Sequence, residues 1–436
     1  RLAVLLQRFS PWARCGACCM APAFASASAQ AFASSARDVD HTRGGEPTRR
    51  EPMPPRSAFG PDELAAIQEV IAYYKEKRLD PGYQGIFEKR YTDAFVELMG
   101  GGYADAVATG TAALFVAIAA LGLPAGSEVI VSPITDPGSI GAIVLNRLVP
   151  RVADSEPDSY NIGVEQFVSR ITPNVRAVMV VHSIGRAADI VAITNEAHAR
   201  GIRVIEDCSQ SHGARVNGRP VGTFGDIAAF STMYRKAHVA GSSGGIVYSR
   251  DLDLFRQALA HADRGKPRWR DDFSDYDPNG FLFPALNLHT DEISCGIGLA
   301  SLHRLQNTIL RRLIFVAEFT GRMRDRCKIC RPYGYSPSDS PFVYPVIVDP
   351  DRITCTKREF AEAVLAEGIG LNPHYQYLVV DWPWLRPHLA DEFETANARS
   401  IRDRSFCLYL NENYGIREAS DCTKAIVKVE RHFGRP

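Results

Sequence analysis

Length, composition and charge place the chain among ordinary globular proteins. It has 436 residues, of which 45% are hydrophobic and 23% charged, and its 50 basic residues balance 50 acidic ones. This balance gives no indication that the protein binds nucleic acid or an acidic membrane surface. The longest apolar run, Ala112–Leu123, is too short to cross a bilayer and is typical of a buried helix.

Ten cysteines are scattered along the chain rather than packed into a short framework. This usage predicts reduced thiols and a cytoplasmic protein, because small secreted domains concentrate their cysteines. Cys327 and Cys330 have the CxxC spacing of metal sites, but no further ligands follow at zinc-binding spacing. We therefore interpret this spacing, and that of CGACC at 15–19, as chance, and predict no metal site.

Residues 1–55 differ in composition from the rest of the chain. They are rich in Ala, Ser and Arg, and contain no acidic residue before Asp38. Transit peptides share this composition, so a targeting segment is one interpretation. The alternative, which we favour, is a disordered leader that takes no part in the fold, because the segment shows no sustained periodicity.

Two helices are predicted directly after the leader. The proline and two acids at 61–63 suit the first turn of a helix, and a helical apolar stripe continues to Tyr74. The second helix is predicted from Ile86 to Met99, and the glycines that begin at Gly100 end it.

From residue 104 to 250, the apolar pattern alternates between strands and helices. The segment at 112–121 is apolar on all sides and predicts a buried helix, whereas 190–200 predicts an amphipathic one. Near-continuous apolar strands separated by helices favour a mostly parallel sheet covered on both faces. The strands are predicted at 128–133, 176–183, 203–207, 227–231 and 244–249.

A smaller α+β segment is predicted at the C-terminal end. We expect an α/β fold with a large domain at 56–310 and a small C-terminal α+β domain at 311–436. The remaining predicted elements are helices near 252–262 and 290–324, a strand at 343–348, and helices at 357–367 and 420–432.

Several polar residues follow predicted strands, where open α/β sheets bind their ligands. Gly110 and Thr111 open the buried helix, and the free N–H groups of a helix start attract an anion. An ordinary threonine cap is the alternative for this motif. Taken singly, Asp207 is a turn cap, His182 is a hydrogen-bonded structural residue, and Lys236 is a surface charge.

Together these residues are more informative than they are singly. Lys236 follows the strand at 227–231, and it lies 29 positions after Asp207 (236 − 207). Pyridoxal phosphate needs an amine for a Schiff base, a carboxylate that keeps its pyridine nitrogen protonated, and donors for its phosphate. Lys236, Asp207 and the group of Gly110, Thr111 and Ser231 supply all three, so the set predicts a pyridoxal phosphate site.

Seven segments resemble the DegT/DnrJ/EryC1/StrS family of sugar aminotransferases, and they occur in the order of the family's motifs. The resemblance covers about residue 56 to the C-terminus, and it implies the aspartate aminotransferase (type I) fold. The segments are ATGTAAL (108–114), EVIVSPIT (128–135), YNIGVEQF (160–167), ITPNVRAVMVVHSIG (171–185), VIEDCSQSHGA (204–214), VGTFGDIAAFS (221–231) with Lys236, and ALNLHTDEISCGIGLASLHRL (285–305).

The resemblance implies a role for each matching position. Lys236 occupies the position of the Schiff-base lysine, which afterwards shuttles protons as a free amine. Asp207 matches the aspartate on the pyridine nitrogen, and Gln210 matches the glutamine near the ring hydroxyl. Asn287 matches an asparagine that reaches the cofactor phosphate of the partner subunit, which implies a homodimer with shared active sites.

Further positions complete the implied site. His182 is a third catalytic candidate beside Lys236 and Asp207, and the resemblance places both His182 and His212 near the substrate pocket. The implied phosphate-binding group comprises Gly110, Thr111, Ala112 and Ser231.

Some positions depart from the family's pattern. Asp136, which we include among the cofactor-binding candidates, stands where members often place an aromatic residue against the cofactor ring. His289 stands where an arginine is common, and the glycine-rich turn at 241–245 also differs. Some relatives carry histidine in place of the lysine and catalyse dehydration. Retention of Lys236 argues against dehydration, although His238 is near in sequence.

The expected function is therefore a pyridoxal-phosphate aminotransferase that moves an amino group from L-glutamate, or a similar donor, to a keto-sugar nucleotide. A keto-cyclitol or another cyclic ketone is an alternative acceptor. An alternative from a different functional class is a protein that binds pyridoxal phosphate without catalysing amino transfer. A nicotinamide-binding Rossmann domain is disfavoured, because no GxGxxG motif follows a predicted strand.

Overall fold

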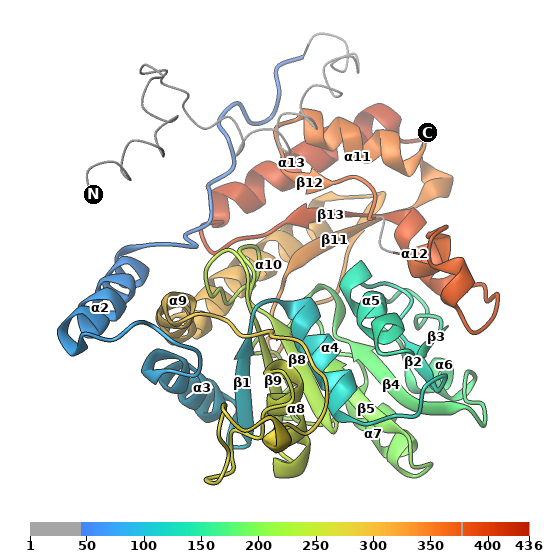
Figure 1. Ribbon diagram of the computed structural model, residues 1–436. Helices are drawn as coiled ribbons and strands as arrows, with labels where there is room; N and C mark the ends of the chain where they lie inside the picture. Colours follow the sequence, from blue (N-terminus) through green and yellow to red (C-terminus); the bar gives the residue numbers. More distant parts are fainter. Residues whose placement is uncertain (1–44, 376–377, 436) are drawn as a thin grey trace, which may run out of the picture. The chain divides into compact units, whose positions relative to one another are not determined.

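A seven-stranded sheet stands at the centre of the computed structural model, which describes residues 45–375 and 378–435 (Figure 1). Five neighbouring strands, β3, β2, β4, β5 and β8, pair in parallel, and β9 pairs antiparallel with both β8 and β1. This confirms the predicted α/β fold with a mostly parallel sheet. From edge to edge the strands are β1 (Tyr103–Val107), β9 (Gly245–Ser249), β8 (Ile227–Ser231), β5 (Arg203–Asp207), β4 (Val175–Val181), β2 (Glu128–Val131) and β3 (Val149–Val152).

Helices cover both faces of this sheet, which explains why its strands are apolar on successive residues. In β8, Ile227 and Ala229 pack into one layer, while Ala228 and Phe230 pack into the other. The first layer contains α4 (Gly110–Ala120), α5 (Pro137–Leu145) and α8 (Leu252–Ala262). The other layer contains α2 (Pro61–Lys77), α3 (Ile86–Met99), α6 (Val164–Val168), α7 (Ile190–His198) and α9 (Glu292–His303).

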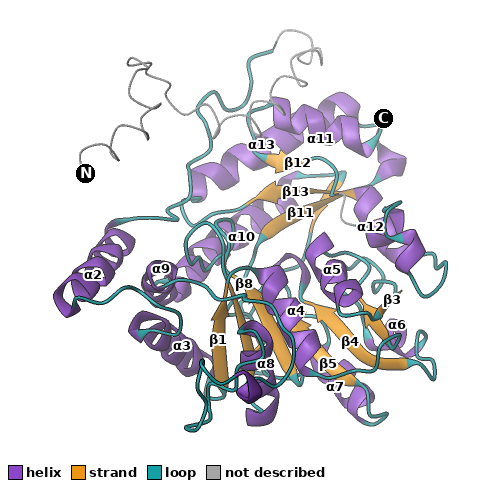
Figure 2. Cartoon of the chain, viewed as in Figure 1, coloured by secondary structure: helices purple, strands orange, loops and turns teal. Residues whose placement is uncertain are grey.

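A second, four-stranded antiparallel sheet forms the C-terminal part of the chain, where Figure 2 shows it above the large sheet. Helices α10 (Leu305–Arg326), α11 (Lys357–Ala366) and α13 (Ile416–Phe433) pack against it around a shared apolar core. Helix α12 (Ala396–Arg404) directly precedes strand β13 (Ser405–Tyr409) of this sheet. The strands, in order, are β10 (Cys330–Pro332), β11 (Val343–Val348), β13 (Ser405–Tyr409) and β12 (Leu371–Asn372); β6 (Arg215–Val216) and β7 (Arg219–Pro220) form a separate ribbon.

The long helix predicted near 290–324 is two helices. Helix α9 begins after Asp291, whose side chain accepts the amide hydrogen of Ser294, and it ends at His303, with Arg304 as its C-cap. Helix α10 begins at the next residue. Both halves carry the apolar period of a helix, so periodicity alone did not reveal the break.

Residues 47–55, which the sequence placed in a disordered leader, pack against the C-terminal helices. The amide and hydroxyl of Thr48 donate hydrogen bonds to Glu367 at 2.7 and 2.6 Å, and buried Arg49 pairs with Asp421 at 2.8 Å. These contacts are polar, and so they leave no apolar period in the sequence. Residues 1–44, with the question of a targeting segment, lie outside the described residues. Within the described part of the chain, no helix has both the length and the apolar character needed to cross a bilayer.

The turn after β4, at Ser183–Gly185, joins the large sheet to the C-terminal part. The amide of Ser340 donates to the carbonyl of Gly185, and the amide of Phe342 donates to the carbonyl of Ile184, both at 2.9 Å. Ile184 has a φ of 58°, which is rare for a β-branched residue. A Cβ at Gly185, whose φ is 92°, would lie 1.9 Å from the carbonyl oxygen of Ser340. Only glycine therefore fits at this position of the turn at Ser183–Gly185, which we call the docking turn.

Gly185→Ala is expected to lower the free energy of unfolding by about 2–4 kcal/mol, because the new methyl group meets backbone that is itself hydrogen-bonded. Gly321→Ala is the matched control. Gly321 lies inside α10 with nothing within 4 Å of the added Cβ, so this variant should gain about 0.5–1 kcal/mol. The denaturant midpoint of each variant provides the measurement. A Gly185→Ala protein as stable as the unmodified chain would contradict this account of the turn.

Candidate functional site

Lys236 lies in the loop that follows β8, and it is half-buried rather than a free surface charge. Its amine sits over the ring of Phe342, 4.7 Å from the ring centroid. Burial lowers the pKa of Lys236, whereas the nearby carboxylates of Asp207 and Asp136 raise it. The effect of burial is larger than that of the two carboxylates, so the pKa of Lys236 is lower in this site than in water.

Asp207 is the last residue of β5, and its side chain is buried. One carboxylate oxygen accepts a hydrogen bond from the hydroxyl of Ser139 at 2.9 Å, and the other accepts from the amide of Ser209 at 3.0 Å. The hydroxyl of Ser139 also pairs with that of Thr135 at 2.7 Å. These contacts fix the orientation of the carboxylate at the edge of the sheet. The sequence did not identify Ser139, since it lies in an apolar helix.

The start of α4 lies tightly against Ser231, the last residue of β8. A Cβ at Gly110 would approach the Cβ of Ser231 to 2.4 Å, so only glycine permits this contact. The hydroxyl of Thr109 accepts the amide hydrogen of Ala112 at 2.8 Å. A threonine cap is therefore present, but the capping residue is Thr109. The amides of Gly110 and Thr111 remain at the positive end of the helix dipole, which favours an anion.

Gln210 and Asp136 occupy two other predicted positions. The side-chain oxygen of Gln210 accepts the amide hydrogen of Ile184 at 2.6 Å, and its nitrogen lies 3.5 Å from the hydroxyl of Tyr375. Gln210 therefore ties the docking turn to the C-terminal part. Asp136 is exposed and caps α5, because its side chain accepts the amide hydrogen of Gly138 at 2.9 Å.

The imidazole of His182 is fully buried, and both of its nitrogens have partners. Nδ1 accepts the amide hydrogen of Ala188 at 3.1 Å, so the ring proton is on Nε2, which lies 3.0 Å from Glu206. The hydrogen bonds therefore fix the tautomer of this histidine. Glu206 also accepts hydrogen bonds from the amides of Gly222, Phe224 and Gly225.

Two further histidines lie behind the lysine loop. His212 is buried against Phe230 and His238, and neither of its ring nitrogens has a hydrogen-bond partner among the described residues. Burial lowers the pKa of His212 well below its usual value, and lowers that of His238 to about 3. His238 pairs with the hydroxyl of Tyr91 at 2.6 Å. Both rings are therefore neutral at physiological pH.

Asn287 and His289 lie in the segment before α9. The side chain of Asn287 is exposed, with its nitrogen 3.4 Å from the hydroxyl of Tyr83. His289 is buried and stacks on the ring of Tyr83 at 4.7 Å, and its Nε2 lies 3.2 Å from a carboxylate oxygen of Asp263. The histidine that replaces the family's common arginine thus faces an acidic partner.

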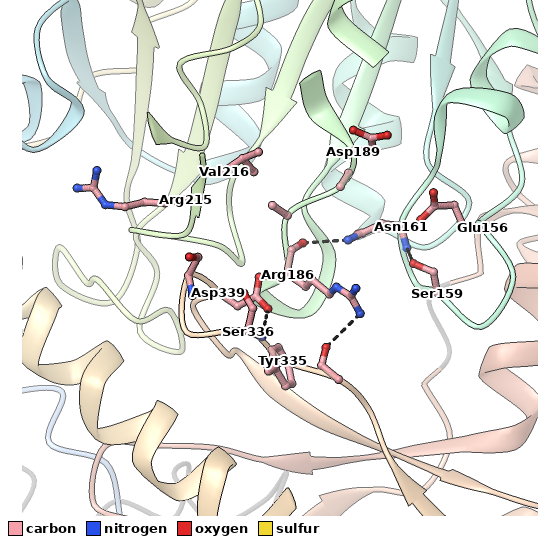
Figure 3. Close-up of a pocket in the computed structure, with 14 residues that line it drawn as sticks. Glu156, Ser159, Asn161, Arg186, Asp189, Arg215, Val216, Tyr335, Ser336 and Asp339 are labelled. Carbon is pink, nitrogen blue, oxygen red and sulfur yellow. Dashed lines mark hydrogen bonds between the residues drawn. The ribbon is translucent and has the colours of Figure 1, made fainter. Parts of the chain in front are cut away.

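A cavity of about 590 Å³ opens beside the docking turn (Figure 3). Its walls carry Glu156, Asp189 and Asp339 together with Arg186 and Arg215. The guanidinium of Arg186, which is labelled in Figure 3, donates to the carbonyl of Gly334 at 3.1 Å. The lysine and aspartate at the strand ends do not line this cavity, so its size is no guide to the chemistry. The strand-end residues are the better candidates, because they combine an amine, a carboxylate and a helix start.

The sequence profile of the DegT/DnrJ/EryC1/StrS aminotransferase family matches residues 64–426. The chain therefore belongs to this family, and the resemblance read from its motifs is confirmed.

Two curated relatives have named activities. A GDP-perosamine synthase from Vibrio cholerae is 32% identical over 242 residues, which is 54% of this chain and 63% of the relative. An L-glutamine:2-deoxy-scyllo-inosose aminotransferase from Micromonospora echinospora is 36% identical over 217 residues, 49% of this chain and 51% of the relative. The matches thus span little more than half the length of these relatives.

A solved structure supports the fold. The Escherichia coli GDP-4-keto-6-deoxy-D-mannose-3-dehydratase with bound hydrated PLP is 21% identical and superposes with a TM-score of 0.78, over 86% of this chain and 99% of that one. At this identity, the likeness supports the fold alone.

Asp136→Asn is expected to lower the pKa of Lys236 further, because it removes a negative charge that favours the ammonium form. Asparagine caps helices as well as aspartate does, so α5 should remain intact. The measurement is the pH dependence of labelling of Lys236 by an amine-reactive reagent in cofactor-free protein, read by peptide mass spectrometry. The half-maximal rate should move to lower pH.

Asp189→Asn is the control for this shift. Asp189 caps α7 in the same way, but its charge is not among those that act on Lys236. Its labelling curve should match that of the unmodified protein. A curve for Asp136→Asn that is unchanged, or that moves to higher pH, would show that the charge of Asp136 does not reach the amine.

Proposed function

We propose that this protein is a pyridoxal-phosphate-dependent aminotransferase that transfers an amino group from L-glutamate, or a similar donor, to a keto-sugar nucleotide. One observation carries the proposal: a half-buried lysine amine in the loop after β8 is under the influence of a buried aspartate at the end of the neighbouring parallel strand β5, and a helix start meets the end of β8. Membership of an aminotransferase family supports it.

The residues at this edge fit pyridoxal phosphate. The amides of Gly110 and Thr111 and the hydroxyl of Ser231 form a glycine-lined cradle at the positive end of α4, as a phosphate requires. Asp207 supplies a fixed carboxylate for a protonated pyridine nitrogen. The amide of Ala112 is engaged by the threonine cap, so we assign it a smaller part in phosphate binding.

When bound, pyridoxal phosphate supplies an electron sink for charge that develops on the carbon of the amino donor or the acceptor. Lys236 is the residue that moves the proton. Burial favours its neutral amine, which accepts a proton from the donor carbon, and the neighbouring carboxylates favour the ammonium form that returns it. Asp207 holds a proton at the pyridine nitrogen.

The remaining candidates act by position. Both nitrogens of His182 are engaged, so we assign this residue the role of holding the strand end rather than of transferring a proton. Gln210, implied near the ring hydroxyl, also sets the distance between the docking turn and Tyr375. Asp136 stands where the family often has an aromatic residue, and there it would bring a negative charge near the bound cofactor and Lys236.

We also propose a homodimer with shared active sites, in which Asn287 reaches the cofactor phosphate of the partner subunit. The exposure of Asn287 supports this assignment, as do the exposed apolar side chains of Leu282 and Leu286 beside it. A cytoplasmic location is proposed as well. Its support is that the seven cysteines in the described part of the chain are free.

A keto-cyclitol is the second candidate acceptor. The departures from the family's pattern at Asp136 and His289 support it, because they change the residues that surround the cofactor. One relative, at 36% identity, is named for an inosose substrate, whereas another, at 32% identity, is named for GDP-perosamine synthesis. Both acceptors therefore belong in the same assay.

Lys236→Ala is expected to abolish the absorbance of the Schiff base between cofactor and protein and to lower turnover by about 10²–10⁴-fold, since the proton-transferring amine is lost. Lys357→Ala is the matched control. Lys357 is also buried, with a pKa lowered to about 8, but its amine donates to the carbonyl of Pro373. This variant should keep the absorbance. A Lys236→Ala protein with full turnover would rule out the proposed mechanism.

A panel of acceptors should separate the two candidate substrates. With L-glutamate and L-glutamine as donors, a keto-sugar nucleotide is expected to give a kcat/KM at least about 100-fold above that for a keto-cyclitol, because groups that bind the nucleotide are left unpaired by an acceptor that lacks it. The reverse ratio would favour the cyclitol. A spectrum that responds to neither donor would indicate a cofactor-binding protein without turnover.

A further inference from the structure

Residues 47–60, the N-terminal segment, are held by side chains that donate hydrogen bonds to the backbone carbonyls of the segment. The side chains of Asn411 and Asn413 donate to the carbonyls of Pro54 and Pro55 at 2.8 and 2.7 Å. Arg304 donates to the carbonyls of residues 57 and 58 at 2.6 and 2.8 Å. The segment is therefore held at residues 54 and 55 and again at residues 57 and 58, on both sides of residue 56.

Arg56, within this segment, is bonded directly to the loop that carries Lys236. One guanidinium nitrogen donates to the carbonyl of Tyr234 at 2.7 Å, and another donates to the carbonyl of Lys236 itself at 2.8 Å. The planar guanidinium can bridge two acceptors at once, which a lysine ammonium does less well. Burial lowers the pKa of Arg56 to about 10, so the group stays charged at physiological pH.

Glu412 lies between Arg56 and a second guanidinium, that of Arg312. One oxygen of Glu412 accepts the amide hydrogen of Ser57 at 2.8 Å and lies 3.9 Å from Arg56. The other accepts from the buried guanidinium of Arg312 at 3.3 Å, and Arg312 donates in turn to the carbonyl of Pro341 at 3.2 Å.

The next residue after Pro341 is Phe342, whose ring lies under the amine of Lys236. The carbonyl of Lys236 and the carbonyl of Pro341, which precedes Phe342, thus each accept from a guanidinium, and both guanidinium groups lie beside Glu412.

Buried charges are costly unless they are paired and hydrogen-bonded. A segment that only needed anchoring has other anchors, since Arg304 and the two asparagines already hold it. The lysine loop has neither helix nor strand between Ser231 and Gly245, and two of its glycines, Gly241 and Gly244, have positive φ. The guanidinium of Arg56 supplies two fixed donors to this irregular backbone.

We propose that Arg56, held by Glu412, is a positioning residue for Lys236, and that it fixes the loop so that the amine stays against Phe342. This assignment rests on the proposed function of Lys236 as the reactive amine. Arg56 contacts the backbone of that loop and no reacting atom, so it acts through Lys236.

The test compares Arg56→Met with Arg304→Met. Both variants remove a guanidinium that donates to two carbonyls, and both loosen the N-terminal segment, but only Arg56 bonds to the lysine loop. Arg56→Met is expected to lower kcat about 10- to 100-fold with KM for the amino donor changed less than about threefold, because a displaced catalytic group loses rate rather than binding. Arg304→Met should lose stability but keep kcat.

A second readout does not depend on the cofactor. In cofactor-free Arg56→Met, the amine of Lys236 is expected to leave its half-buried position. Its labelling curve should therefore move to higher pH, toward an ordinary lysine. Arg56→Lys should give an intermediate curve and an intermediate kcat. If Arg56→Met does not fold, the same measurements are made on Arg56→Gln, which keeps one donor nitrogen.

Equal kcat values and equal labelling curves for the Arg56 and Arg304 variants would overturn the proposal and leave Arg56 as an anchor. This outcome is distinct from failure of the proposed function, in which Lys236→Ala would retain turnover whatever the Arg56 variants do.

Discussion

The amine of Lys236 is held against the ring of Phe342, while the carboxylates of Asp207 and Asp136 oppose the effect of its burial. Removal from water favours the neutral amine, because the ammonium form loses its hydration. Nearby carboxylates favour the ammonium form. A lysine under both influences can accept a proton and return it, which is what amino transfer asks of one residue. The other features of the site hold the amine, the ring and the two carboxylates in place relative to one another.

The large sheet supplies the first of those constraints. Because β5 and β8 are parallel neighbours, Asp207 lies opposite Ala229, and both strands end at the same edge. Gly110 brings the start of α4 against the end of β8, so the positive end of a helix meets the same edge. The second constraint crosses to the C-terminal part. The turn at Ser183–Gly185 docks on residues 340–342 and so places the ring beneath the amine.

Much of this arrangement could be predicted from the sequence, and the omissions have physical causes. Strands β5, β8 and β11 have the predicted bounds, because each contains consecutive apolar residues and is followed by polar ones. Strands β1 and β3 were missed. Asp105 is buried in β1, and Arg151 in β3 pairs with Glu128, so both strands lack a clear apolar pattern.

The lysine and the aspartate were predicted as a pair because strand ends share an edge. Arg56 was not predicted, since its bond to the lysine spans 180 residues of sequence and leaves no local pattern.

The most direct test of the central claim is the site of covalent attachment of the cofactor. The full chain would be incubated with pyridoxal phosphate, reduced with borohydride, and digested for peptide mass spectrometry. The account predicts one modified peptide, with the added mass on Lys236. Modification of Lys357 or another lysine in its place, or no modification at all, would contradict the claim that Lys236 is the reactive amine of this protein.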